Sequence, residues 1–216
     1  MTQLTIAIAK GRLQAETLDL LSLAGLGLSS ETISSSRRLA VEDESGRYRL
    51  IFVKPADVPV YVEHGIADCG IVGRDVLLES EPDLLQPLSL NIGACRIVVA
   101  ASENPQVNQP GILRVATKYP RIAARHFGSR GVAVELIQLS GSVELASVLG
   151  LADCIVDLVE TGNTLRENGL KIIEVITDST ARLVVNRASY QLKAGAVGRL
   201  VQSLEQTKGA IWSAPA

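Results

Sequence analysis

The 216-residue sequence is poor in the residues that several protein functions require. Aromatic residues make up only 3%, which leaves few rings on which nucleic-acid bases could stack. The 21 Lys and Arg residues are balanced by 23 Asp and Glu residues, and the resulting net charge of -2 argues against a general nucleic-acid or anionic-membrane surface. We therefore predict no nucleic-acid partner, and any anion-binding site must be local.

Long apolar runs and a secretory leader are also missing. The stretch LLSLAGLGL, residues 20–28, is too short to span a membrane and is interrupted by glycines. The N-terminal MTQLTIAIAKGRL has neither the charged start nor the cleavage site of a signal peptide. We expect a cytoplasmic protein without a membrane partner.

Cysteine and histidine are too few and too scattered for the usual metal-ligand motifs. Cys69, Cys95 and Cys154 lie in separate apolar segments, so we predict buried, reduced thiols. His64 and His126 fall in helical patterns without metal-ligand spacing, so we predict satisfied or solvent-facing side chains. A Walker loop, a dinucleotide fingerprint and a GxSxG elbow are also absent from the sequence.

The residues that are abundant describe an ordered globular protein, with 47% hydrophobic and 20% charged residues. Strand-like apolar runs alternate with helix-period segments, which predicts an α/β fold with mostly parallel sheets. The predicted strands are 4–9, 48–53, 69–72, 96–101, 113–117, 133–138, 154–159 and 172–177. The predicted helices are 13–24, 57–64, 119–129, 143–149 and 192–211. The polar stretch 102–111 is either a domain boundary or a loop within a domain.

The segment DLVETGNTL, residues 157–165, is the strongest candidate site. A predicted strand leads into two carboxylates, Asp157 and Glu160, and a short helical segment follows the loop. Free backbone N–H groups after a strand bind phosphate, and Gly162 allows the backbone to approach a ligand closely. Acids beside an anion cradle fit a ribose 5-phosphate, because its hydroxyls can bond to the carboxylates while the loop holds the phosphate.

The loop also has an ordinary structural interpretation. Thr161 and Thr164 add hydroxyl donors for a ligand, but Thr164 and Glu167 have the spacing of a capping box. Judged on the turn alone, a strand, a turn and a well-capped helix explain these residues as well as a binding site does.

Read with its neighbours, the loop resembles the ATP phosphoribosyltransferase family. The similar segments are AIAKGRL, DVPVYVEHGIADCGIVGRDVL, RVATKYP and GSVELASVLGLADCIVDLVETGNTL. The signature positions are Glu144, Gly150, Ala152, Ile155, Asp157, Leu158, Thr161, Gly162, Thr164 and Leu165. The resemblance runs over nearly the whole chain and is closest to the short form of the family, which lacks a C-terminal regulatory domain.

The resemblance implies a two-lobed α/β fold like that of type II periplasmic binding proteins, with the active site in the cleft. One lobe would comprise residues 1–92 and 179–216, and the other residues 93–178. The implied reaction moves a phosphoribosyl group from phosphoribosyl pyrophosphate to N1 of the ATP adenine, the first step of histidine biosynthesis. Mg²⁺ would arrive with the substrate phosphates. The implied partner is a regulatory subunit resembling histidyl-tRNA synthetase, in a homo- or hetero-oligomer.

The same resemblance assigns roles to residues. The predicted catalytic residues are Arg38, Lys54, Asp157 and Glu160. The phosphoribosyl-pyrophosphate loop would use Asp157, Glu160, Thr161, Gly162, Asn163 and Thr164. ATP or pyrophosphate would be bound by Lys10, Gly11, Arg12, Asp68, Gly70, Gly73 and Glu144. Lys54 stands where the family usually has arginine, and lysine keeps the charge but not the bidentate fork.

Without the resemblance, some of these residues have ordinary explanations. Segment 10–12 is typical of a helix start with solvated basic residues, and segment 68–73 is typical of a buried core strand. Two other functions remain open on the residues: a non-catalytic small-molecule-binding module of the same fold, and a phosphoribosyltransferase that acts on another base.

Overall fold

The computed structural model describes residues 2–27, 39–102 and 112–212, without the side chains of 208–212. The chain divides into two units, which we call unit 1 (Met1–Gly93 with Thr180–Ala216) and unit 2 (Ala94–Ser179). These boundaries lie one residue from those that the family resemblance implies. Each unit has its own sheet and its own helices, so the predicted two-lobed α/β architecture is confirmed.

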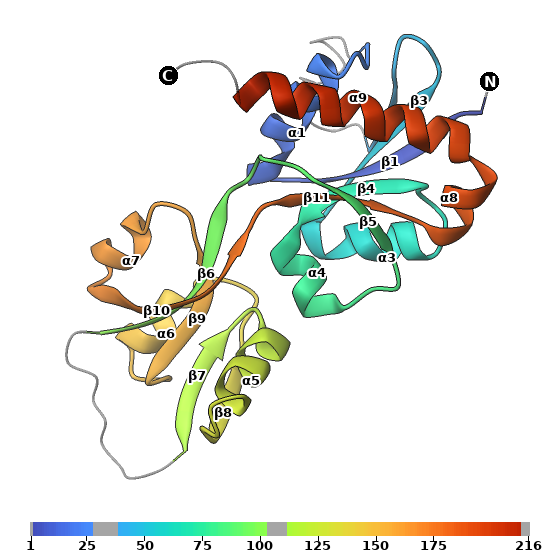
Figure 1. Ribbon diagram of the computed structural model, residues 1–216. Helices are drawn as coiled ribbons and strands as arrows, with labels where there is room; N and C mark the ends of the chain where they lie inside the picture. The colour runs from blue at the N-terminus through green and yellow to red at the C-terminus, as the bar shows by residue number, and fades with distance from the viewer. Residues whose placement is uncertain (1, 28–38, 103–111, 213–216) are drawn as a thin grey trace. The chain divides into compact units, whose positions relative to one another are not determined.

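Within the described residues, unit 1 contains a six-stranded sheet in the order β2-β3-β1-β4-β11-β5 (Figure 1). The parallel strands are β1 (Leu4–Ala9), β3 (Tyr48–Val53) and β4 (Cys69–Gly73), with β1 in the middle. Strands β2 (Ala40–Glu42) and β11 (Ala181–Val185) run in the opposite direction, and β5 (Leu85–Ser89), which is antiparallel to β11, runs in the same direction as β4. The sheet is therefore mixed. One of its inner strands, β11, lies between β4 and β5 and comes from the C-terminal part of the chain.

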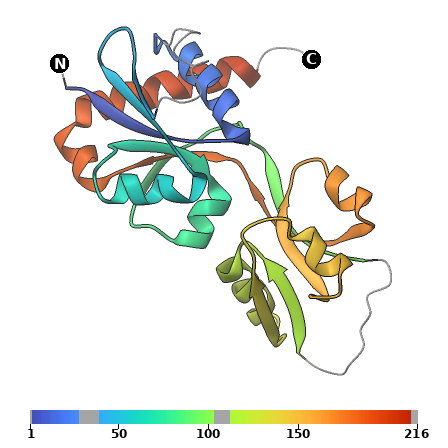
Figure 2. The same cartoon turned by 180° about the vertical axis from the view of Figure 1, so that it is seen from behind.

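Helices cover both faces of this sheet (Figures 1 and 2). One face carries α1 (Arg12–Leu23) and α9 (Ala194–Trp212), and the other carries α3 (Val58–Glu63) and α4 (Arg74–Ser80). The short elements η1 (Pro55–Asp57) and α8 (Arg187–Leu192) precede α3 and α9. Helix α1 forms because Leu13, Thr17, Leu20 and Leu21 recur at helical spacing and pack on the sheet as one buried face.

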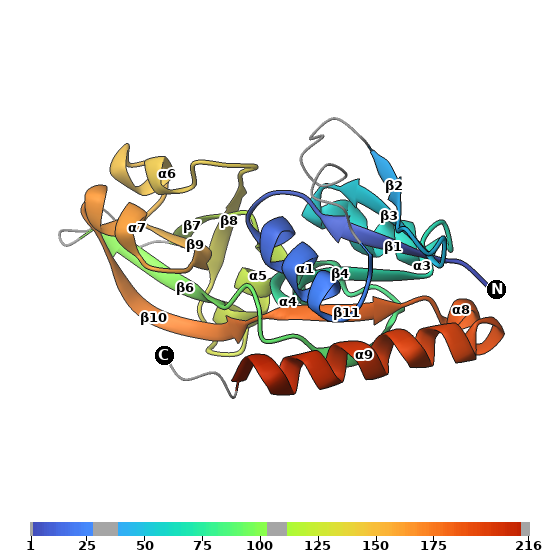
Figure 3. The same cartoon turned by 90° about the horizontal axis from the view of Figure 1, so that it is seen from above.

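Unit 2 has a five-stranded sheet in the described residues, in the order β10-β6-β9-β7-β8. Its strands are β6 (Cys95–Ser102), β7 (Leu113–Thr117), β8 (Val134–Gln138), β9 (Cys154–Val159) and β10 (Leu170–Ser179). Strand β7 is parallel to β8 and β9, whereas β6 is antiparallel to β9 and β10. Helices α5 (Pro120–Gly128), α6 (Glu144–Val148) and α7 (Asn163–Glu167) accompany this sheet (Figure 3).

All predicted strands and helices are present, and their ends agree with the observed ends within two residues. The predicted α/β fold class is confirmed, and the sheets are mixed: β2 and β11 in unit 1 and β6 in unit 2 run against the other strands of their sheets. Alternation of strand and helix indicates parallel pairing only where a helix connects the strands. Here β5 leads to β6, and β10 leads to β11, without an intervening helix.

The polar stretch 102–111 lies outside the described residues except for Ser102, which ends β6. Among the described helices, none combines the length and the apolarity that a membrane crossing requires.

Candidate active site

The parallel strands of unit 2 bring three segments together at one end of the sheet. Strands β7, β8 and β9 share one direction, so their carboxyl ends meet, and ligands of α/β sheets bind at such ends. The segment after β7 begins with Lys118, the segment after β8 leads to Glu144 at the start of α6, and the predicted loop follows β9. Glu144 thus lies with the phosphoribosyl loop, and not with the basic residues of unit 1 with which it was grouped.

Asp157 lies in β9, just below this loop, and its side chain is only 8% exposed. Burial raises the pKa of its carboxyl group above the ordinary value, and the nearby Glu144 raises it further. The Leu158 backbone N–H, which donates to Oδ1 at 2.8 Å, and the charge of Lys118 oppose that rise. A buried carboxylate with a raised pKa at the carboxyl end of a sheet is a candidate functional group.

The loop after β9 turns at Gly162, which has φ 79° and ψ 4° in the left-handed region. A Cβ added at this position would lie 3.8 Å from Val159 Cγ1, which is ordinary contact. The backbone conformation, and not crowding, therefore requires glycine here. Glu160, Thr161, Asn163 and Thr164 are exposed at the surface of unit 2, whereas Leu165 is buried.

The capping-box interpretation of the loop is wrong. Helix α7 begins at Asn163, its N-cap position is Gly162, and no side chain caps it. Thr164 is therefore inside the helix and cannot act as its N-cap. The Asn163 side chain accepts a hydrogen bond from the guanidinium group of Arg166, and its backbone N–H donates to Thr161 Oγ1 at 3.4 Å. The side chain of Thr164 is exposed, in a position where a ligand could reach it.

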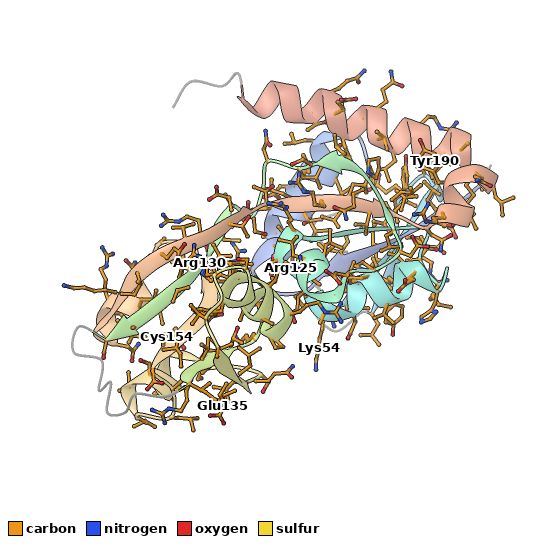
Figure 4. All side chains as sticks on the ribbon, turned by 60° about the horizontal axis from the view of Figure 1, so that its bottom comes forward. Lys54, Arg125, Arg130, Glu135, Cys154 and Tyr190 are labelled. Carbon is orange, nitrogen blue, oxygen red and sulfur yellow. The ribbon has the colours of Figure 1, made fainter. Side chains whose placement is uncertain are left out.

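Unit 1 shows the same arrangement at the carboxyl ends of its own parallel strands. Lys10, Gly11 and Arg12 follow β1, Lys54 follows β3, and Gly73 ends β4. The Lys10 backbone N–H donates to the last carbonyl oxygen of β3 at 2.8 Å, which joins two of these ends. Gly11 has φ 94° and precedes α1, a conformation that favours glycine. Lys54 is exposed and extends away from the ribbon (Figure 4).

Asp68 was predicted to bind ATP or pyrophosphate, and in the structure its carboxylate is hydrogen-bonded within unit 1. It precedes β4 and so lies at the amino end of the parallel strands, opposite to the basic residues. Its carboxylate accepts hydrogen bonds from the Thr5 N–H at 2.8 Å, Ser189 Oγ at 2.6 Å and Lys193 Nζ at 2.8 Å. Burial raises its pKa, but these hydrogen bonds outweigh burial and hold the pKa below the ordinary value. Asp68 ties the C-terminal helices to the sheet.

Gly70 was predicted to lie against the same ligand, and the structure shows what packs against it within unit 1. An added Cβ would lie 2.7 Å from Val58 Cγ1 and 2.9 Å from Val62 Cγ2, both on α3. Close packing of α3 on β4 explains why glycine stands at this position. Arg38, predicted to be catalytic, lies outside the described residues.

The three cysteines and His64 lie as expected, whereas the His126 side chain is mostly buried and its Nε2 makes no hydrogen bond within the described residues. All three cysteines are free and buried, and burial raises the pKa of Cys69 to about 12 and of Cys154, labelled in Figure 4, to about 11. His64 is exposed, and the His126 Nε2 lies 3.4 Å from Glu174 of β10. In the part of the chain that the structure describes, no cluster of three or more His, Cys, Asp or Glu residues could hold a metal ion.

Lys118 is a residue of this region that the sequence interpretation did not single out. Its segment, RVATKYP, contributed to the family resemblance, but no role was assigned to the lysine. The signal that could have identified it is its position, directly after a predicted strand that precedes the loop-bearing strand by two strand-helix repeats.

Two α/β units, each with parallel strands whose carboxyl ends meet at one edge, place the chain in the class of α/β proteins with the fold of the two-lobed binding proteins. The periplasmic aliphatic sulphonate binding protein SsuA from Escherichia coli shares this fold, with a TM-score of 0.59 over 99% of this chain and 75% of that chain. At 11% identity, SsuA shows the fold alone.

The chain belongs to the ATP phosphoribosyltransferase family, whose model, HisG, matches residues 54–206. The ATP phosphoribosyltransferase of Sorangium cellulosum is 50% identical over 201 residues, which cover 93% of this chain and 94% of that protein. The enzyme of Geobacillus sp. strain WCH70 is 49% identical over 203 residues, which cover 94% and 98%. The ATP phosphoribosyl transferase (HisG:HisZ) complex from Thermotoga maritima has a similar chain, with a TM-score of 0.81, 37% identity and coverage of 95% and 97%.

Proposed function

We propose that this chain transfers the phosphoribosyl group of phosphoribosyl pyrophosphate to N1 of the ATP adenine and releases pyrophosphate, as the first step of L-histidine biosynthesis. One observation carries the proposal: the family's signature loop follows β9 at the carboxyl end of the parallel strands, directly above the buried Asp157. The identity of 50% to a curated ATP phosphoribosyltransferase supports the choice of ATP as acceptor.

In this proposal, unit 2 binds the ribose and its 5-phosphate. Asp157 and Glu160 accept hydrogen bonds from the ribose hydroxyls and balance the positive charge that builds on the sugar ring as pyrophosphate leaves. The backbone N–H groups and hydroxyls of residues 161–164 hold the 5-phosphate. Gly162 has a positive φ and no side chain, so the phosphate can approach the backbone of the turn closely.

Unit 1 supplies positive charge for the phosphate chains. Lys10, Arg12 and Lys54 lie at the carboxyl ends of β1 and β3, and we assign them to the leaving pyrophosphate and to the triphosphate. Arg38 belongs to the same assignment from sequence alone. N1 of adenine has a lone pair ready to attack the anomeric carbon, so orientation and charge neutralisation are the main tasks and no strong general base is required.

Mg²⁺ is proposed as a cation that the substrates bring with them. The donor chemistry fits, because Mg²⁺ prefers oxygen ligands and keeps several waters, and phosphate oxygens can supply the rest. We assign no protein ligand to it. The expected result is that a chelator abolishes product formation and that added Mg²⁺ restores it.

We further propose that the chain works in the cytoplasm with a separate regulatory subunit resembling histidyl-tRNA synthetase. The solved relative from Thermotoga maritima is a HisG:HisZ complex, which supports an assembly of two kinds of subunit. Co-purification of this chain with such a subunit, followed by determination of the mass of the complex, tests the proposal.

The direct test of activity is the ultraviolet absorbance of phosphoribosyl-ATP, measured with and without the regulatory subunit. Folded protein that makes no product with both substrates saturating would refute the proposed reaction. A thermal-shift series with ATP, phosphoribosyl pyrophosphate and free amino acids distinguishes the alternative. Stabilisation by both phosphorylated ligands supports the transferase, whereas stabilisation by an amino acid alone indicates a non-catalytic binding module.

A further inference from the structure

Thr117, the last residue of β7, is fully buried and connects three segments of unit 2. Its hydroxyl group donates to the Val156 carbonyl oxygen of β9 at 2.7 Å and accepts from the Tyr119 backbone N–H at 2.8 Å. Its own carbonyl oxygen accepts from the Leu139 N–H at 2.9 Å, after β8. The turn that follows β7 is therefore fixed relative to β9, the strand that carries Asp157.

The residue that this turn presents is Lys118. Side chains alternate between the two faces along a strand, and Ala116 belongs to the same core cluster as Ile155 and Val159 of β9. Asp157 lies between these two in β9 and faces the same side of the sheet. Lys118 is two residues beyond Ala116, which continues this alternation toward that side.

The charge of Lys118 reaches Asp157 without forming a direct contact. Lys118 lowers the pKa of the buried carboxyl group, against the larger effect of burial, while Glu144 of α6 acts in the opposite direction. Among the described residues, no ion pair joins Lys118 to Asp157, and the lysine is exposed. Its ammonium group, a compact charge with three donors, is available to an anionic ligand at the carboxyl end of the sheet.

We propose that Lys118 binds a phosphate oxygen of phosphoribosyl pyrophosphate beside Asp157, and that Thr117 is the positioning residue that holds Lys118 there. This inference rests on the proposed function. A polyanionic ligand meets two carboxylates here, Asp157 and Glu144, so a cation at the same end of the sheet offsets their repulsion. Arg166, the basic residue of α7, is hydrogen-bonded to Asn163 of the loop.

The experiment compares three variants and a matched control in the full chain. Lys118→Met removes the ammonium group and keeps most of the stem. Thr117→Val removes the hydroxyl group at nearly constant volume, whereas Thr117→Ser keeps the hydroxyl group and removes only the methyl group. Lys171→Met makes the same change as the first variant at another exposed lysine of unit 2, on β10. Calorimetry measures the Kd of phosphoribosyl pyrophosphate and of ATP for each protein.

We expect Lys118→Met to weaken phosphoribosyl pyrophosphate about tenfold or more, as for a lost hydrogen bond to a charged group, with ATP affinity unchanged. Thr117→Val weakens the same ligand, whereas Thr117→Ser and Lys171→Met keep the wild-type affinity. If Thr117→Val does not fold, the affinity of Lys118→Met still decides the proposal, and Thr117→Ser still shows whether the hydroxyl group is sufficient at position 117. Wild-type affinity in Lys118→Met overturns it.

A second readout separates positioning from simple structural support. The acid limb of kcat/KM for phosphoribosyl pyrophosphate reports the pKa of Asp157 in the free enzyme, since only the ionised carboxylate accepts the ribose hydroxyls in the proposed mechanism. Loss of the Lys118 charge raises that pKa, so the limb moves to higher pH in Lys118→Met and Thr117→Val. A limb that stays in place in both overturns the proposal. Wild-type protein that neither binds phosphoribosyl pyrophosphate nor makes product would refute the proposed function itself.

Discussion

Gly162→Ala is the sharpest single test of the loop after β9. The residue has φ 79°, and the added methyl group would meet only Val159 Cγ1 at 3.8 Å, so the substitution adds backbone strain without a clash. An L-residue in the left-handed region costs about 1–2 kcal/mol. This free energy must appear either in the stability of the protein or in the binding of the ligand.

We expect most of it to appear in binding. The loop is exposed, and α7 that follows has only 5 residues, so the free loop can relax away from the left-handed turn. Phosphoribosyl pyrophosphate must then restore the strained turn, which weakens its binding about 5–30-fold, while the affinity for ATP stays the same. Calorimetry gives the two affinities, and urea unfolding gives the free energy of unfolding.

Gly131→Ala is the matched control. Gly131 has φ 70°, and a Cβ there meets nothing within 4 Å, but the residue lies in the turn after α5. We expect this variant to lose stability and to keep its affinity for phosphoribosyl pyrophosphate. A Gly162→Ala protein that behaves in the same way would show that the strained turn is only structural, and the assignment of the loop would fail.

Three further predictions concern Thr164 and Asp157 in unit 2 and Gly70 in unit 1. Thr164→Val removes an exposed hydroxyl group and should weaken phosphoribosyl pyrophosphate about tenfold or more without affecting ATP, as measured by calorimetry; an equal loss for both ligands would contradict the assignment. Asp157→Asn keeps an acceptor for the Leu158 N–H and should lower turnover, yet raise the melting temperature near neutral pH. Because burial raises the folded-state pKa, the wild-type carboxylate destabilises the fold above that pKa, so the advantage of the variant should fade as pH falls toward the ordinary value of 3.8 in a series of thermal melts. Gly70→Ala should cost about 1–3 kcal/mol of unfolding free energy through overpacking against α3, with the affinity for phosphoribosyl pyrophosphate unchanged.

The features that the sequence alone predicted well are local. Strand β1 and strand β9 are marked by their own apolar residues, and the loop after β9 is one contiguous segment. The features that the sequence did not show depend on pairing between distant segments. The direction of β11 is set by its neighbours β4 and β5, and its five residues contain no sign of it.

The same distinction between local features and the pairing of distant segments explains which properties of the site residues the sequence could show. Asp68 precedes β4 and Gly73 ends it, and only the direction of that strand in the sheet shows that Asp68 lies at the end opposite to the basic residues. Thr117 and Val156 are 39 positions apart, and their hydrogen bond arises from the pairing of β7 with β9. The role proposed for Lys118 rests on that pairing, whereas the sequence marks only its position directly after a predicted strand.

The position of β11 also has a consequence for the order in which the protein folds during synthesis. Its residues Leu183, Val184 and Val185 are fully buried between β4 and β5, yet they leave the ribosome only after all of unit 2. Unit 2 is continuous, and its first and last strands already pair Cys95 with Ser179. The second unit to be started is therefore the first that can be completed. Until β11 arrives, the nascent N-terminal half exposes the unpaired side of β4, a period in which chaperones would be needed most.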